Sequence, residues 1–173
     1  MNRKLLRSSL LLTALVLGGC SGGPEDEGNL NNGEASLSGS LAFEVKAAQV
    51  VARTLPDGGP DYSRLTVVLT SVEVPCEELT SSVTGPGWGL VLEARNPSGD
   101  AAKGTFASTG SNIYRVQFNP DGGAALGIDW LEGSFTVNFD ADPTAGATGT
   151  VDLGSTDGGT LQGSFTATWC GTY

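Results

Sequence analysis

The residues able to do chemistry in this chain of 173 are carboxylates, cysteines and a few aromatic side chains, because the sequence contains no histidine. Without histidine, neither a Ser-His-Asp nor a Cys-His arrangement can form, and no metal site can include an imidazole. The glycine-rich stretches are short, and no strand-to-helix pattern follows them as a phosphate-binding loop requires. A glycosidase-like pair of carboxylates remains possible, but no spacing singles one out. We therefore expect no catalytic residue, no metal and no cofactor.

Three aromatic residues are the candidates for a recognition surface. Trp130 follows Asp129 at the end of an expected strand, and it is the tryptophan that we expect to be exposed. Tyr62 and Tyr114 are the other two candidates, since aromatic side chains dominate recognition surfaces. Trp88 and Trp169 share the apolar face of their strands, which favours the core for both.

The tripeptide Asp-Gly-Gly occurs at Asp57, Asp121 and Asp157. Calcium prefers carboxylate and carbonyl oxygens, but calcium loops space several acidic residues alternately, and none of these segments does. Asp followed by a glycine in the left-handed conformation is typical of tight turns. We therefore predict three turns.

The first twenty residues have the features of an export signal. Arg3, Lys4 and Arg7 supply three basic residues at the start of an apolar stretch that, counted from position 5, ends at Leu17. This run of about 13 residues is shorter than the roughly 20 that a membrane-spanning helix needs. Gly18 and Gly19 then supply the small residues of a cleavage site.

Leu17-Gly18-Gly19-Cys20 resembles the lipobox of bacterial lipoproteins, in which diacylglycerol is joined to the cysteine thiol, the preceding bond is cut and the new amino terminus is acylated. The resemblance covers residues 1–20. It implies cleavage between Gly19 and Cys20 and a bilayer anchor on Cys20; the alternative is an ordinary secretory signal cut near Gly19. In such lipoproteins Ser21 is typical of an outer-membrane address, with the side of the membrane left open.

The overall plan is similar to that of small lipoproteins of Gram-negative bacteria whose domains have no assigned activity. With Cys20 taken by lipid, Cys76 and Cys170 remain as an even pair in a compartment where disulfides persist. We predict that these two are bonded to each other; the alternative is two buried free thiols.

Residues 20–36 form the expected tether, since residues 21–36 contain one large apolar residue and cannot offset the entropy of ordering. The signal holds three of the nine basic residues, so the mature chain has 19 acidic against six basic residues and a net charge of −13. This field repels nucleic acid, whose partners need Lys and Arg.

From Leu37 onward, apolar and polar residues alternate as in half-buried strands. We expect one all-β domain, residues 37–173, with about eight antiparallel strands in a sandwich or small barrel and one disulfide. The expected strands cover residues 37–48, 64–74 with a bulge near 70–71, 88–95, 104–108, 113–118, 125–130, 131–140, 148–153 and 160–170. The alternation breaks at residues 49–51, where we expect a bend, a bulge or a second strand.

A short repeat lies in the second half of the chain. Leu131–Phe139 and Leu161–Trp169 share the pattern Leu-x-Gly-Ser-Phe-Thr. One repeat pair cannot build a solenoid. It predicts two strands in equivalent environments of one sheet, each with a glycine where a neighbour approaches or the strand bends.

Together these features predict a lipid-anchored envelope protein whose non-catalytic β domain binds a partner protein or a glycan. One alternative is a small carboxylate-dependent hydrolase that acts on envelope polysaccharide. Another is ligand storage inside a barrel, which needs an apolar cavity of a few hundred Å³.

Changing Cys20 to Ala should abolish labelling by radioactive palmitate and release the protein from membranes, because no other residue of the lipobox can carry the acyl chains. Cys76→Ala is the control, since it also removes one thiol but leaves the lipobox intact. Labelling that survives in the Cys20→Ala protein would reject the anchor.

Overall fold

The computed structural model describes residues 33–76, 79, 86–110, 112–121, 125–140 and 143–173. Cys20, the signal and most of the tether therefore lie outside the described residues. Within them no helix is long and apolar enough to cross a membrane. The described residues form one short 3-10 helix, Pro143–Ala145, and ten strands: β1 Glu34–Ser38, β2 Ala47–Thr54, β3 Pro60–Thr70, β4 Gly87–Arg95, β5 Gly104–Ala107, β6 Ile113–Phe118, β7 Gly127–Trp130, β8 Glu132–Val137, β9 Ala147–Gly154 and β10 Thr160–Thr172.

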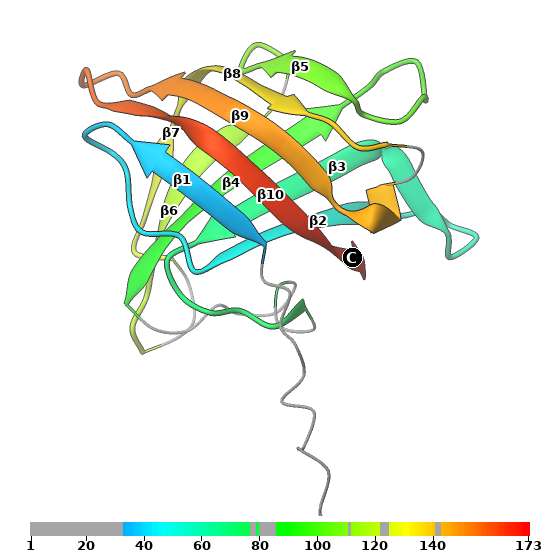
Figure 1. Cartoon of the computed structure of the whole chain (residues 1–173), viewed down its shortest axis with the longest axis horizontal. Coiled ribbons are helices and arrows are strands. Elements are labelled where there is room, and N and C mark those ends of the chain that lie inside the picture. The colour runs from blue at the N-terminus through cyan, green and yellow to red at the C-terminus, as the bar shows by residue number, and fades with distance from the viewer. Residues whose placement is uncertain (1–32, 77–78, 80–85, 111, 122–124, 141–142) are drawn as a thin grey trace, which may run out of the picture.

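The strands form one curled sheet in the order β5-β8-β9-β10-β2-β3-β4-β6-β7, with β1 also paired to β10. The sheet folds back on itself, so that β1, β10, β9 and β8 lie across β2, β3, β4 and β6 (Figure 1). The prediction of an all-β fold is confirmed. We call β1, β5, β8, β9 and the start of β10 the β9 half, and β2, β3, β4, β6, β7 and the end of β10 the β3 half.

The long strand β10 belongs to both halves. Its residues 160–167 pair antiparallel with β9, and residues 162–166 also pair with β1 on the other edge. Residues 168–172 pair with β2, and this pairing is parallel, with a register shift between Trp169 and Thr172. The other neighbouring strands of the sheet are antiparallel.

The core lies between the two halves. Alternate residues of the strands point inward, as the period of two along a strand requires. The β9 half contributes Phe135, Val151 and Phe165, and the β3 half contributes Val67 and Leu92, each at most 4% exposed. One face of each half is buried in this core, and the opposite face points away from it.

The repeat prediction is confirmed. β8 and β10 carry the two copies, and both pair antiparallel with β9, one on each side. A Cβ at Gly133 would lie 2.2 Å from the carbonyl oxygen of Asp152, and one at Gly163 would lie 2.1 Å from that of Ser36. Both glycines therefore stand where a neighbouring strand approaches closely.

Two expected boundaries are wrong. Strand β1 begins at Glu34, so it includes three residues that the composition places in the tether. Residues 39–46 are turn and irregular chain, not strand. Gly39 has a φ of 107°, which turns the chain out of the ladder, yet Leu41, Phe43 and Val45 still pack against the core. Their alternation therefore reflects packing without strand pairing.

The strand expected over residues 64–74 also differs from the structure. β3 begins earlier, at Pro60, and ends at Thr70, so no bulge near residue 70 carries it onward. Instead, the following segment leaves the ladder and covers the outer face of β2. There, the backbone oxygen of Val74 accepts a hydrogen bond of 2.5 Å from Nε2 of the buried Gln49.

Two of the three predicted turns are confirmed. The backbone N–H of Gly59 donates to Oδ1 of Asp57 at 3.1 Å, in the turn between β2 and β3. Asp157 lies in the turn between β9 and β10, where the N–H of Ser155 donates to the oxygen of Gly159. The glycines that follow Asp121 lie outside the described residues.

The predicted disulfide between Cys76 and Cys170 is confirmed, with 5.0 Å between the two Cα atoms. Cys170 lies on β10 just past the point where this strand passes from one half to the other. The bond therefore ties the segment after β3 to the strand that joins the halves.

Replacing both Cys76 and Cys170 by Ser should lower the free energy of unfolding by about 4 to 5 kcal/mol, because the bond closes a loop of roughly 95 residues in the unfolded chain. Urea unfolding of the soluble domain measures the loss. Thiol titration of the unreduced, denatured protein should find no free thiol at either position, and two free thiols would contradict the bond.

Candidate functional site

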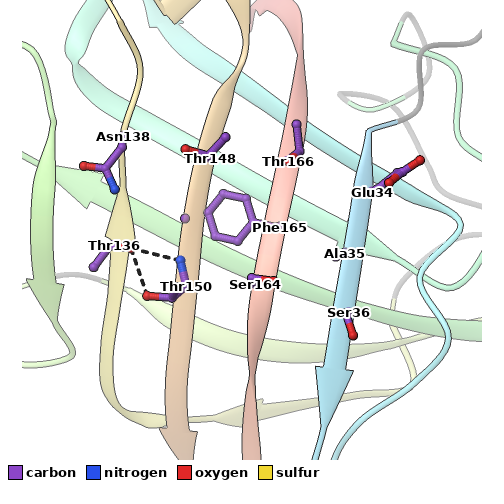
Figure 2. Close-up of a pocket in the computed structure, with 11 residues that line it drawn as sticks. Glu34, Ala35, Ser36, Thr136, Asn138, Thr148, Thr150, Ser164, Phe165 and Thr166 are labelled. Carbon is purple, nitrogen blue, oxygen red and sulfur yellow. Dashed lines mark hydrogen bonds between the residues drawn. The ribbon is translucent and has the colours of Figure 1, made fainter.

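The outer face of the β9 half is polar. Register aligns Thr105, Thr136, Thr150, Ser164 and Ser36 in one row across five strands. Figure 2 shows part of this row around a cavity of about 430 Å³. The hydroxyls of Thr136 and Thr150 lie 2.9 Å apart, and Oγ1 of Thr136 also accepts the backbone N–H of Thr150. Such hydroxyl-bearing residues are the ordinary partners of water on an exposed sheet.

The outer face of the β3 half is apolar instead. Register places Val68, Val91, Tyr114 and Trp130 in one row across β3, β4, β6 and β7. The next row, on β4, β6 and β7, is Gly89, Val116 and Ile128. On β3, β4 and β6 these residues alternate with core residues such as Val67, Leu92 and Ile113, and the register continues the same face onto β7, so their side chains point away from the core.

A groove of about 550 Å³ lies on this apolar face. The described residues that line it are mostly valine and aromatic, with one charged residue, Glu93: Val51, Thr66, Val68, Leu79, Val91, Glu93, Tyr114, Val116, Phe118 and Tyr173. Gly89 makes room for one wall, because a Cβ there would lie 2.7 Å from Cζ of Phe118. As far as the described residues form it, the groove is therefore mainly apolar, and Glu93 is its single acidic position.

The polar groups of the groove lie on its Thr66 and Glu93 side. The hydroxyls of Thr66 and Tyr173 are 3.2 Å apart. Oε2 of Glu93 accepts hydrogen bonds from Arg95 at 2.9 Å and from Nδ2 of Asn112 at 2.7 Å. Glu93 pairs directly with Thr66 across β3 and β4, so these groups form one polar edge of an otherwise apolar surface.

Strand β7 extends the apolar face beyond the groove. Leu126, Ile128 and Trp130 are 58%, 53% and 61% exposed, although all three are large and apolar. β7 is also the last strand of the sheet, with one edge unpaired among the described strands. Leu131 N–H donates to the oxygen of Ile113, so by the antiparallel alternation the N–H and C=O groups of Ile128 and Trp130 point toward that free edge.

Contacts on both faces of β6 hold β7 in place. On the outer face, the rings of Tyr114 and Trp130 lie 5.3 Å apart, centroid to centroid. On the inner face, Arg115 donates to Asp129 at 3.2 Å and to the backbone oxygen of Leu41 at 3.1 Å. The guanidinium of Arg115 also stacks 3.9 Å from the ring centroid of Trp88, a cation–π contact. These contacts fix the exposed strand β7 against β6.

The structure brings together two of the three aromatic candidates. Trp130 and Tyr114 are neighbours on the apolar face, and Trp130 is exposed as expected. Tyr62 lies elsewhere: it packs against the core and its ring is 5.9 Å from that of Trp169. Sequence reasoning missed Val68 and Val91. The one feature of the sequence that could have identified them is that they are apolar on the face opposite to the core residues of their strands.

The acidic residues do not gather in these cavities. Each of four surface cavities lined by described residues has one carboxylate in its lining: Glu34, Glu93, Asp140 and Asp61. Two carboxylates are needed for the acid and base roles of glycoside hydrolysis. Among the described residues, no group of three or more acidic or cysteine side chains is placed to hold a metal ion.

No family model, curated protein or solved structure matches this chain. Its function is therefore inferred from the chemistry of its surfaces.

Burial raises the pKa of Tyr114, and the negative charge of Glu93 and the proximity of Tyr173 raise it further. The folded protein thus holds this phenolic proton more tightly than the unfolded chain does. The resulting stabilisation is fully present below the ordinary tyrosine pKa of about 10 and is lost as the pH rises through the higher folded value.

Absorbance titration of the folded protein should therefore show a late tyrosinate step that Tyr114→Phe removes. Glu93→Gln should move this step to lower pH without restoring the ordinary value, because burial remains. Tyr62→Phe is the control and should leave the late step in place. A late step that survives in Tyr114→Phe would contradict the assignment.

Proposed function

We propose that this protein is an envelope lipoprotein, anchored through Cys20, that binds a partner protein through the outer face of β3, β4, β6 and β7. The observation that carries the proposal is the pair of apolar rows on this face, whose Val68, Val91 and Tyr114 are half-buried and whose ends on β7, Ile128 and Trp130, are exposed. Large apolar residues gathered at one surface mark interaction sites, and aromatic residues supply much of the binding energy at protein interfaces.

A protein partner is favoured over a glycan by the side chains of this face. Valine side chains cannot hydrogen-bond sugar hydroxyls, whereas they bury well against apolar side chains. The free edge of β7 adds backbone donors and acceptors that an extended segment of a partner can pair with, as in strand addition. The polar face of the β9 half offers hydroxyls to a sugar, but its one aromatic lining residue, Phe165, is 4% exposed.

The alternative of a carboxylate-dependent hydrolase needs two carboxylates about 5 to 9.5 Å apart in one cleft. Among the described residues, the groove beside Trp130 has Glu93 as its one carboxylate, and Oε2 of Glu93 already accepts hydrogen bonds from Arg95 and Asn112. The geometry therefore supports binding better than it supports hydrolysis.

A photoreactive amino acid at position 128 should crosslink to a specific envelope protein in living cells, and the same group at Thr150 on the polar face should not. With the photoreactive group kept at position 130 in place of Trp130, Ile128→Lys should remove the crosslinked species, because it places a charge in the apolar interface. Thr150→Lys is the matched control, since it adds the same charge to a sheet face in the other half.

Thermal unfolding of both lysine variants checks that the domain still folds. A crosslink that appears from position 150 instead of 128, or one that Ile128→Lys leaves unchanged, would contradict this binding face.

A further inference from the structure

We infer that the groove of the β3 half accepts a protein segment in which a Lys or Arg side chain lies beside apolar residues; the inference rests on the proposed function and names the chemistry of its partner. The groove combines three features that such a segment needs: an apolar floor, aromatic walls and one carboxylate at the edge. Each feature is formed by residues already described.

The carboxylate has room for a second cation. Arg95 and Asn112 both donate to Oε2 of Glu93, and no hydrogen bond to Oε1 is found among the described residues. The side chain of Glu93 is 23% exposed and that of Arg95 is 49% exposed. An exposed ion pair of this kind is weak, so Arg95 does not remove the preference of Glu93 for a further positive charge.

The aromatic walls favour the same ligand. Tyr114, Phe118 and Tyr173 line the groove, and an ammonium or guanidinium group near an aromatic face gains a cation–π attraction that grows with desolvation. The methylene stem of a Lys or Arg side chain can then lie along Val68 and Val91, as long charged side chains commonly do on apolar surfaces.

The charges of the groove and of the whole chain disfavour two other occupants, an acidic segment and a second copy of this protein. No Lys or Arg is among the described lining residues, and Arg95 at the edge is already paired with Glu93, so an acidic segment would find little countercharge there. A second copy of this chain is disfavoured because each mature copy carries a net charge of −13, and like charges oppose association. A segment that is both basic and apolar is attracted by Glu93 in the groove and by the net negative charge of the whole protein.

Three blocked synthetic peptides test the inference: acetyl-Val-Ile-Lys-Val-Ile-amide and the same peptide with norleucine or Glu in place of Lys. Binding to the soluble domain is followed by tryptophan fluorescence. The Lys peptide should bind on the order of tenfold more tightly than the norleucine peptide, from its cation–π and charge-assisted contacts, and the Glu peptide most weakly.

Glu93→Gln should abolish the advantage of the Lys peptide and leave the norleucine peptide unchanged. Glu132→Gln removes one carboxylate from the β9 half and serves as the matched control, which should keep the preference for Lys. Thermal unfolding checks that the domain still folds in both variants.

Equal binding of the Lys and norleucine peptides overturns the inference but leaves the apolar binding face of the proposed function in place. Binding of none of the three peptides also overturns it, and crosslinking from position 128 then decides separately whether the proposed function stands. Concentration-dependent dimerisation that Ile128→Lys abolishes would assign the face to a second copy instead.

Discussion

The pairing of β10 with strands of both halves is the constraint on which the rest of the structure depends. Residues 160–167 pair with β9 and β1, and residues 168–172 pair with β2, so one continuous strand passes from one half to the other. This pairing curls a single sheet around a shared core instead of leaving two separate sheets. The disulfide at Cys170 adds a covalent tie near that passage.

Once the inner faces are buried together, each half is free to use its outer face differently. The β9 half follows the usual solution, with Thr and Ser alternating against buried Val and Phe. The β3 half does not, because Val and aromatic residues occupy both faces of its strands. Part of this second apolar face is covered by the chain itself, where Val74 lies over Gln49, and the remainder, from β3 to β7, is left partly exposed by the described residues. The core packs between the other faces, so the uncovered rows point to a role outside folding.

The periodicity of single strands predicts much of this fold but not the binding face. β4, β6, β9 and β10 follow the alternation closely, and the shared pattern of 131–139 and 161–169 correctly predicts two strands in equivalent environments of one sheet. The alternation fails at residues 39–46, because packing against a core and pairing in a ladder leave the same pattern in a sequence.

The candidate site needs information that no single strand contains. Val68, Val91, Tyr114 and Trp130 come from four strands, and only the order β3-β4-β6-β7 and its register make them neighbours. A long connection that contains β5 separates β4 from β6 in the sequence, so adjacency along the chain does not predict their pairing. Tyr62 illustrates the converse: as an aromatic residue it resembles Tyr114, but its position in the strand order takes it to Trp169.

A protein with an exposed apolar face has to bind its partner without associating with copies of itself, and a strong negative charge helps with both. Exposed Ile128 and Trp130 alone would favour association of copies through the free edge of β7, which is the usual hazard of an uncovered edge strand. The acidic net charge opposes that association at long range and, through the same field, speeds the approach of a basic partner. Salt weakens the long-range field more than it weakens contacts inside a desolvated groove. Under the proposed function, the general acidity of the chain governs the rate of encounter, and the placement of Glu93 among aromatic residues governs which segment stays bound.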